Sequence, residues 1–373
     1  MKIVADDKIP FLRGALEKFA EIIYVPGKDI RNEIIKDADA LLIRTRTKCN
    51  EELLRGTPVR FIGTATIGFD HIDTGYCEKN NIHWTNAPGC NSSSVQQYIT
   101  AALLRIAKDH HFNPEEKTLG IVGVGNVGSK VEKAARALGM NVLLNDPPRE
   151  RKEGKKNFVL LGDILYNSDI ITVHVPLNMA GEDCTWHLFN EKSFKKMRKG
   201  TWFINSSRGE VADTASIKKA LSNDKIKAIL DVWENEPNID LNLMHLAFIA
   251  TPHIAGYSTD GKANGTAMIV NSLAEFFELP LENWYPKNVP LPAGTDIMID
   301  CKGRNNIEVI REAVTRTYNI DQDDIRLRLS PGDFERQRGD YPLRREFTSY
   351  RVKLKNGNNQ VTGKLKELGF KIV

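Results

Sequence analysis

The chain has 373 residues, of which 41% are apolar and 27% are charged, and its formal net charge is +4. This composition is typical of a soluble globular protein, and at roughly 150 residues per domain the length predicts two or three domains. No apolar run approaches the roughly 20 residues of a membrane span, and Asp6 and Asp7 interrupt the start of the chain before a signal-type apolar core develops. We therefore expect a cytoplasmic protein without a membrane partner.

Residues that commonly bind metals or nucleic acids lack the matching patterns. The five cysteines are scattered without C-x-x-C pairing, which argues against a disulfide framework and against a zinc site. The pair His110-His111 has no carboxylate or thiol at ligand spacing, so we expect a solvated loop rather than a metal site. Basic residues gather between Arg326 and Lys355, but acids interrupt them, so a solvated face or a subunit contact is expected rather than nucleic-acid binding.

Residues 1 to about 90 alternate apolar strand candidates with helical patterns, which predicts a doubly wound parallel sheet. Ligands bind such sheets beyond the carboxyl ends of the strands, which points to the loops 44–48 and 64–70. The second loop has the backbone freedom and the hydroxyls to hold a small anion, and it equally fits a plain strand-to-helix turn. The strand candidates lie at 2–5, 40–43, 59–63 and 82–85, with a helix near 11–19.

The stretch 119–128 joins a short apolar run directly to G-x-G-x-x-G and then to a helical pattern, and a second strand candidate closes on Asp146. Strand, glycine loop, helix and strand form one βαβ unit of the dinucleotide-binding type. The first glycine permits the tight turn, the second lets the backbone approach a pyrophosphate, and the third lets helix and strand pack closely. The predicted cofactor loop contains Gly123, Gly125, Asn126, Val127 and Gly128.

Asp146 lies about 20 residues beyond the glycines, where an acid accepts hydrogen bonds from the ribose hydroxyls of the cofactor. Its charge would repel a 2′-phosphate, so NAD is favoured over NADP. Further strand candidates alternate with helices, as in the second half of a dinucleotide-binding sheet. They lie at 170–176, 201–205, 226–230 and 247–250.

Two helices connect the predicted domains. A polar run at 91–94 can cap a helix that leads into the nucleotide-binding sheet, and a helix capped near Ser258 or Thr259 leads back to the first domain. A domain inserted in this way leaves the two crossing helices as a hinge and predicts a ligand cleft between the domains.

Beyond a proline-rich linker near 279–294, the order β-α-β-β-α-β predicts a ferredoxin-like α+β domain. A unit of this size with an open sheet commonly pairs with a copy of itself, so we expect a homodimer. Strands are expected at 297–299, 325–329, 349–354 and 370–372, with helices at 305–318 and 360–368.

The expected fold class is α/β, with two doubly wound parallel-sheet domains of Rossmann-like or flavodoxin-like type and a C-terminal ferredoxin-like domain. The substrate domain is expected at 1–94 and completed by 257–284, the NAD-binding domain at 95–256, and the dimerisation domain at 285–373.

Three polar residues follow strand candidates late in the nucleotide-binding region, namely Arg208, Glu236 and His253. A guanidinium can bind a carboxylate bidentately and fix a 2-hydroxy acid with its C2 hydrogen facing a nicotinamide ring. An imidazole near the C2 hydroxyl can take its proton, and a neighbouring carboxylate would orient the ring and stabilise the imidazolium. Individually, each residue also fits a plainer interpretation, as a surface cation, an exposed turn acid and a loop histidine.

The succession GVGNVG, Asp146, INSSRGEVAD, DVWENEP and TPHIAGYS resembles the D-2-hydroxyacid dehydrogenases, and the resemblance spans residues 1 to about 280. The catalytic Arg, Glu and His of that family occupy these motifs in this order. The resemblance also implies that Asp231 contacts the nicotinamide side of NAD and that Ser206 and Gly256 line the cofactor.

One branch of this family resembles the chain over essentially its whole length, including Pro331-Gly332-Asp333-Phe334 and Arg344-Arg345-Glu346-Phe347. This closer resemblance implies NAD-dependent oxidation of a small phosphorylated 2-hydroxy acid to the 2-oxo acid. It places Thr45, Thr66 and Tyr257 at the substrate and Val175 at a cofactor position. For the phosphate, Arg44, Arg46 and Lys48 are candidates by chemistry alone.

Two alternatives stay open at this stage. A 3-phosphoglycerate dehydrogenase shares the catalytic core and often ends in a ferredoxin-like regulatory domain. An NAD(H)-sensing, corepressor-like protein of the same fold would use dimerisation rather than turnover, and the complete set of Arg208, Glu236 and His253 weighs against it.

Overall fold

The computed structural model describes all 373 residues, and the chain divides into two compact units. The first unit comprises residues 1–91 and 258–290, and the second comprises residues 92–257 and 291–373. The C-terminal residues thus group with the middle of the chain, and the expected boundaries of three separate domains stay predictions. None of the helices combines the length and the apolar character that crossing a membrane requires.

The first unit contains a parallel sheet of five strands in the order β2-β1-β3-β4-β5, which confirms the predicted doubly wound sheet. β3 and β4 are buried throughout, as expected for strands covered on both faces. The strands are β1 (Lys2–Asp6), β2 (Glu21–Val25), β3 (Ala40–Ile43), β4 (Phe61–Thr64) and β5 (His83–Thr85), and the helices are α1 (Asn32–Ile35), α2 (Glu51–Leu54), α3 (Thr74–Lys79) and α11 (Thr259–Phe276).

Two local features of this unit differ from expectation. The helix expected near 11–19 is wrong, because this segment forms turns in which Phe11 has φ 62° and Gly14 has φ 85°, values that no right-handed helix contains. The edge strand β2 was missed. Its residues are only partly buried, so it lacks the alternation of buried and exposed side chains that marks a strand in a sequence.

α11 covers one face of the first sheet, as its apolar stripe predicted. The Ser258 hydroxyl accepts a hydrogen bond of 2.8 Å from the Gly261 N–H and caps the helix. The core on this face combines side chains from both ends of the unit's sequence, among them Ile3, Leu42, Phe61, Ile269, Val270 and Leu273.

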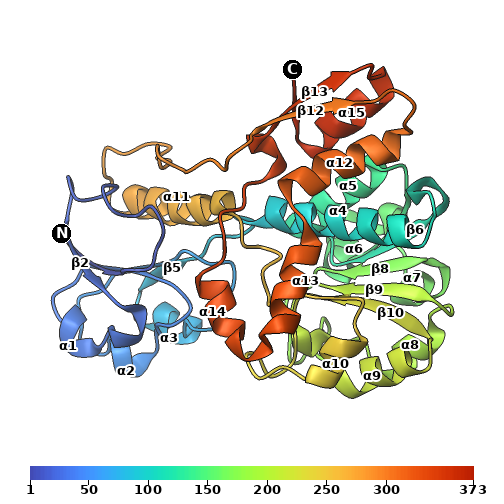
Figure 1. Cartoon of the computed structure of the whole chain (residues 1–373). Coiled ribbons are helices and arrows are strands. Elements are labelled where there is room, and N and C mark those ends of the chain that lie inside the picture. The colour runs from blue at the N-terminus through green and yellow to red at the C-terminus, as the bar shows by residue number, and fades with distance from the viewer. The chain divides into compact units, whose positions relative to one another are not determined.

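The second unit contains a parallel sheet of six strands in the order β11-β10-β9-β8-β6-β7 (Figure 1). The helix that begins at the polar run 91–94 is α4, which packs against α5. The strands are β6 (Thr118–Val122), β7 (Asn141–Asn145), β8 (Ile170–Val173), β9 (Thr201–Asn205), β10 (Ile226–Leu230) and β11 (Ile249–Ala250), and the helices are α4 (Ser92–Asp109), α5 (Asn126–Ala137), α6 (Pro147–Glu153), α7 (Leu161–Asn167), α8 (Glu191–Lys196), α9 (Thr214–Ser222) and α10 (Leu241–Leu246).

The C-terminal residues of this unit add a small sheet of three parallel strands in the order β12-β13-β14. Its helices α12 and α15 pack on α4 and α5, and one hydrophobic core runs through both parts. The strands are β12 (Asp296–Asp300), β13 (Arg351–Lys355) and β14 (Lys371–Ile372), and the helices are α12 (Asn306–Thr317), α13 (Ile320–Leu329), α14 (Phe334–Gly339) and α15 (Asn359–Leu368).

The predicted small C-terminal sheet domain is therefore present, but its ferredoxin-like topology is wrong. The strand expected at 325–329 belongs to helix α13, which lies against β11. The alternation of apolar and basic residues was misleading there, since Leu327 is fully buried while Leu329 is 79% exposed. An Asn319 cap, and an ion pair between Asp324 and Arg328 one turn apart, favour the helix.

The basic residues between Arg326 and Lys355 do not form a single solvated face. Arg344 and Arg345 are only 4% and 8% exposed. The Arg344 guanidinium lies 3.8 Å from the ring centroid of Tyr318 and donates to the carbonyl oxygens of Ser94 and Ile254. These cations join the C-terminal segment to the nucleotide-binding part instead of facing solvent.

Candidate active site

The glycine loop between β6 and α5 has the geometry that its sequence predicted. Gly123 has φ 86°, and a Cβ atom there would lie 2.6 Å from the carbonyl oxygen of His174. A Cβ atom at Gly128 would lie 2.0 Å from the Gly123 carbonyl oxygen, so only glycine permits this approach of helix and strand. Space above Gly125 is open, and the α5 N-terminus that begins there has no side-chain cap. Unpaired helical N–H groups facing open space fit a pyrophosphate.

Asp146 lies at the end of β7 and faces the same loop. One carboxylate oxygen accepts 2.7 Å from the Val124 N–H, and the other accepts 3.0 Å from the Arg149 N–H at the start of α6. The acid therefore fixes the glycine loop. Its contact with the ribose stays a prediction.

Two further predicted cofactor positions lie beside these elements. A Cβ atom built on Gly123 would lie 2.8 Å from the methyl carbon Cγ1 of Val175. Val175 therefore lies against the glycine loop. The hydroxyl of Ser206 is buried without a hydrogen-bond partner. Because buried hydroxyls are normally paired, an orphaned one beside a nucleotide-binding sheet fits a bound polar group.

The three predicted catalytic residues follow three neighbouring strands. β9, β10 and β11 run parallel side by side, so the loops that carry Arg208, Glu236 and His253 leave the same edge of the sheet. The first two loops are in close contact, since a Cβ on Gly209 would lie 2.0 Å from the carbonyl carbon of Trp233. The sheet thus brings the three loops together.

Glu236 and His253 form a hydrogen-bonded pair. Glu236 Oε2 lies 2.7 Å from His253 Nδ1, and its Oε1 accepts 3.0 Å from the Trp233 N–H. Burial by itself would raise the pKa of Glu236, but the hydrogen bond and charge of His253, the Trp233 N–H and the charge of Arg338 hold this pKa below its ordinary value. The carboxylate is therefore ionised near neutral pH, and Nε2 is the ring nitrogen of His253 that this pair leaves for a ligand.

Asp231 holds the backbone of the His253 loop. Its carboxylate is 1% exposed and accepts hydrogen bonds from Thr251 Oγ1 at 2.6 Å and from the N–H groups of Ile254 and Ala255 at 2.8 Å each. Burial raises its pKa despite these donors. His253 itself has φ 55°, and its N–H donates to the Asp231 carbonyl oxygen at 2.7 Å. The buried carboxylate of Asp231, which accepts several hydrogen bonds, thus fixes the unusual backbone conformation of His253.

Arg208 is half-buried on the loop after β9. Its Nη1 donates to the Ser207 carbonyl oxygen at 2.8 Å, and its own carbonyl oxygen accepts 2.9 Å from the Asn205 side chain. The guanidinium thus bonds its own loop rather than the pair of Glu236 and His253.

The predicted substrate residues are divided between the units. Tyr257 follows Gly256 on the His253 loop, and its ring packs edge-on against Tyr341 with centroids 5.8 Å apart. Thr45 is exposed after β3 of the first unit, whereas Thr66 after β4 donates to the Gly68 carbonyl oxygen at 2.9 Å. The roles of these residues at a substrate stay predictions.

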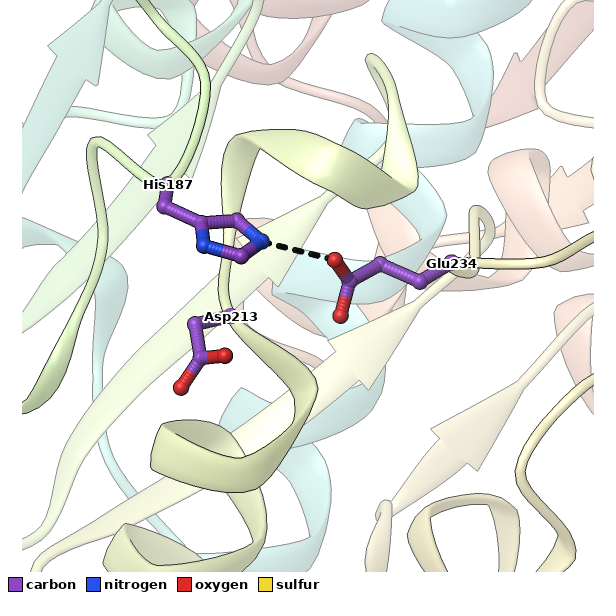
Figure 2. Close-up of side chains that lie close together, drawn as sticks. All are labelled: His187, Asp213 and Glu234. Atoms are coloured by element: carbon purple, nitrogen blue, oxygen red, sulfur yellow. Dashed lines mark hydrogen bonds and ion pairs between the residues drawn. The ribbon is translucent and has the colours of Figure 1, made fainter.

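Figure 2 shows a cluster of possible metal ligands, His187, Asp213 and Glu234, of which Glu234 belongs to the same loop as Glu236. His187 Nε2 lies 2.7 Å from Glu234 Oε1, and Glu234 Oε2 accepts 2.8 Å from the Thr214 N–H. Asp213 caps α9 by accepting from Ser216. Because protein donors engage these carboxylates, the cluster ties the Glu236 loop to α9.

The structure adds residues to which the sequence gave no role. Arg344 reaches the Ile254 carbonyl oxygen, next to His253, from more than 80 positions further along the chain. In the sequence, this residue belongs to the basic cluster between Arg326 and Lys355 and to one motif of the family resemblance. The motif Arg344-Arg345-Glu346-Phe347 is visible in the sequence. Composition alone, however, could not show that its two arginines are buried.

Comparisons with known proteins agree with this geometry. Residues 94–255 match the model of the D-isomer specific 2-hydroxyacid dehydrogenase, NAD binding domain, which confirms the predicted cofactor, NAD. Residues 291–369 match a domain of unknown function, DUF3410.

Two solved structures resemble the chain over most of their own length. A D-lactate dehydrogenase from Aquifex aeolicus, complexed with NAD and lactic acid, is 27% identical with a TM-score of 0.60, covering 76% of this chain and 97% of that one. An NAD⁺-bound 3-phosphoglycerate dehydrogenase from Entamoeba histolytica is 25% identical with a TM-score of 0.61, covering 74% and 95%.

Two curated relatives are similar over nearly the whole chain. The erythronate-4-phosphate dehydrogenase of Bacteroides thetaiotaomicron is 50% identical over 354 residues, covering 94% of this chain and 99% of the relative. That of Proteus mirabilis is 40% identical over 356 residues, covering 94% of each. The chain therefore belongs to the erythronate-4-phosphate dehydrogenase family, within the D-isomer specific 2-hydroxyacid dehydrogenases.

Proposed function

We propose that this protein oxidises 4-phospho-D-erythronate to the 2-oxo acid, 3-hydroxy-2-oxo-4-phosphobutanoate, with NAD, as a step of pyridoxal 5′-phosphate biosynthesis. The observation that carries the proposal is the 2.7 Å pair of Glu236 and His253 at the edge of an NAD-binding sheet. Identity of 50% to a named erythronate-4-phosphate dehydrogenase over nearly the whole chain supports the substrate.

The mechanism uses three side chains. Arg208 binds the substrate carboxylate bidentately and orients the C2 hydrogen. His253 removes the C2 hydroxyl proton through Nε2, since Nδ1 is bonded to Glu236. Glu236 holds the ring and stabilises the imidazolium that forms. When bound, NAD supplies the nicotinamide ring that accepts the hydride.

For the cofactor, the proposal uses the loop and strand ends described above. The open face of the glycine loop would hold the pyrophosphate, and Asp146 would accept hydrogen bonds from the ribose hydroxyls. The residues on the three catalytic loops would hold the nicotinamide end. The residues assigned to NAD are Gly123, Gly125, Asn126, Val127, Gly128, Asp146, Val175, Ser206, Asp231 and Gly256.

For the substrate, Thr45, Thr66 and Tyr257 are the proposed contacts. The first unit also offers cations for the phosphate on the loop after β3. Arg44 donates to the Lys8 carbonyl oxygen at 3.3 Å, and burial together with the Arg44 charge lowers the pKa of Lys262. Arg44 lies on this loop and Lys262 lies on α11, and two cations whose charges act on each other favour an anionic ligand.

We further infer a cytoplasmic homodimer that forms through the C-terminal residues. The strand β12 is an edge of its sheet, and Met298 on it is 63% exposed. An apolar side chain on an open edge strand is suited to pairing with a second copy. Sedimentation of the full chain tests this, because a monomer at micromolar concentration would contradict it.

The decisive experiment is a steady-state assay of the purified protein with a panel of 2-hydroxy acids. We expect the highest kcat/KM for 4-phospho-D-erythronate, with D-erythronate, 3-phosphoglycerate and D-lactate well below it. A higher value for 3-phosphoglycerate would favour the alternative dehydrogenase, and binding of NADH without turnover of any acid would favour the sensing protein. Within the panel, Arg44→Ala and Arg46→Ala should each reduce the preference for phosphorylated acids.

A further inference from the structure

The helix α14 carries an arginine toward the catalytic loops from the C-terminal segment. Packing and hydrogen bonds fix this short helix and the residues that follow it within the second unit. Phe334 is 1% exposed, the Gln337 side chain donates to the carbonyl oxygens of Arg326 and Ser330, and the Tyr341 hydroxyl donates to Asp323 at 2.7 Å. Packing of α14 within the unit therefore holds Arg338 in place.

The Arg338 guanidinium lies between aromatic rings and acids of the active-site side. Its Cζ is 5.7 Å from the ring centroid of Tyr257, to which it also hydrogen-bonds, and 5.8 Å from that of Phe334. Nη1 donates to Glu335 at 3.0 Å. Tyr257 is four residues beyond His253, so this cation borders the histidine loop.

Part of this guanidinium is buried without a partner. The Arg338 Nε atom is buried and has no hydrogen-bond partner, and the side chain as a whole is 22% exposed. Burial would lower the pKa of Arg338, but the charges of Tyr257, Glu236 and Glu335 keep it above its ordinary value, so the group is a cation at all relevant pH. A buried N–H of a cation without an acceptor is costly unless a ligand supplies one.

The acids nearby do not supply that acceptor. Glu236 is engaged with His253 and the Trp233 N–H, and Glu335 bonds Nη1 rather than Nε. A planar guanidinium with a free edge is suited to an oxyanion, and a phosphate presents several acceptor oxygens to it.

We propose that Arg338 is a specificity-determining residue that binds the phosphate group of the substrate beside Tyr257. The inference rests on the proposed function, because it assigns Arg338 to the phosphate end of the substrate whose other end the catalytic residues bind. It also gives the C-terminal segment a direct part in recognition, in addition to any role in dimerisation.

The test compares full-length wild-type protein with Arg338→Met on 4-phospho-D-erythronate and on D-erythronate. Loss of a charge-assisted hydrogen bond predicts that kcat/KM for the phosphorylated acid falls roughly 10- to 100-fold, with a much smaller fall for D-erythronate. Inorganic phosphate should inhibit D-erythronate oxidation competitively in the wild type and more weakly in the variant.

Arg336→Met is the matched control on the same helix. This arginine is 70% exposed and pairs with Asp333, so both activities should stay at wild-type values. Arg338→Lys is the second variant in case the methionine impairs folding. It keeps the charge but loses the planar fork, and an intermediate preference is expected.

Equal loss on both acids in Arg338→Met and Arg338→Lys would overturn the inference, since it would mean that Arg338 only positions Tyr257. Unchanged preference in either variant would overturn it as well. Failure of the proposed function is a separate result, because wild-type protein would then not favour 4-phospho-D-erythronate in the first place.

Discussion

The two large sheets share a topology but differ at the turn that follows the first strand. In the first unit the order is β2-β1-β3-β4-β5, and in the second β7-β6-β8-β9-β10 repeats it before β11 is added. In both sheets the strand order reverses between the first and third strands, where such sheets bind ligands. Only the second sheet has a glycine loop and a helix N-terminus at that point.

In the first unit the protein's own side chains fill the corresponding turn. Asp6 ends β1, is 3% exposed and accepts from the Lys8 N–H at 2.8 Å. A Cβ on Gly27 would lie 2.4 Å from its other oxygen. A buried carboxylate in this place repels a pyrophosphate, so the same strand order serves a nucleotide in one unit and not in the other. We conclude that topology offers a site and that the turn decides its use.

The largest loss of activity is expected from a change in His253, because the proton transfer is assigned to a residue that follows the second sheet. His253→Ala should lower kcat roughly 100- to 10,000-fold, because general base catalysis is lost, while NADH binding is kept. Stopped-flow turnover and NADH fluorescence titration measure the two quantities. Thr45→Ala, on the first sheet, is the control and should act mainly on KM. Near wild-type turnover in His253→Ala would remove the contrast between the sheets.

A smaller effect is expected from single methyl groups in the glycine loop. Gly128→Ala places its Cβ against the Gly123 carbonyl oxygen, so it should destabilise the fold by about 1–3 kcal/mol and also weaken NADH binding. In Gly125→Ala the methyl group enters open space, so the melting temperature should stay unchanged while NADH affinity falls. Thermal melts and NADH titrations of both variants check this. Unchanged affinity in Gly125→Ala would mean that the open space is not the pyrophosphate site.

The smallest effect concerns the choice between NAD and NADP. Asp146→Asn keeps an acceptor for the Arg149 N–H but removes the charge that repels a 2′-phosphate. We expect the ratio of kcat/KM for NAD over NADP to fall about tenfold, a change that corresponds to about 1.4 kcal/mol. A ratio equal to that of the wild type would show that Asp146 serves only to fix the loop.

Sequence patterns could predict those parts of the molecule in which local and tertiary requirements coincide. Gly123 and Gly128 are needed for backbone reasons, and their spacing between a strand and a helix is visible in the sequence. Arg208, Glu236 and His253 follow consecutive strands of a parallel sheet, and so their loops had to meet at one edge.

Other parts depend on contacts that the sequence does not display. Ile325, Leu327 and Leu329 alternate with charged residues as a strand would, yet the residues of this segment that are buried are Ile320, Asp323 and Leu327, on one face of a helix that lies on β11. In the sequence, Asp231 was assigned only to the cofactor. Its hydrogen bonds to the His253 loop could not be predicted, because they depend on how the chain folds. Arg338 lies 85 positions beyond His253, so no local pattern connects them.

The interrupted first unit has a consequence for synthesis of the chain. β1, β3 and β4 are complete by residue 64, but Ile269 and Leu273 of α11, which cover their face, are made about 200 residues later. At 5–20 residues per second this delay is roughly 10 to 40 s. A nascent chain therefore exposes the apolar side of its first sheet to the ribosome surface and to chaperones for that time, while the glycine-loop sheet, continuous in sequence, can form before it.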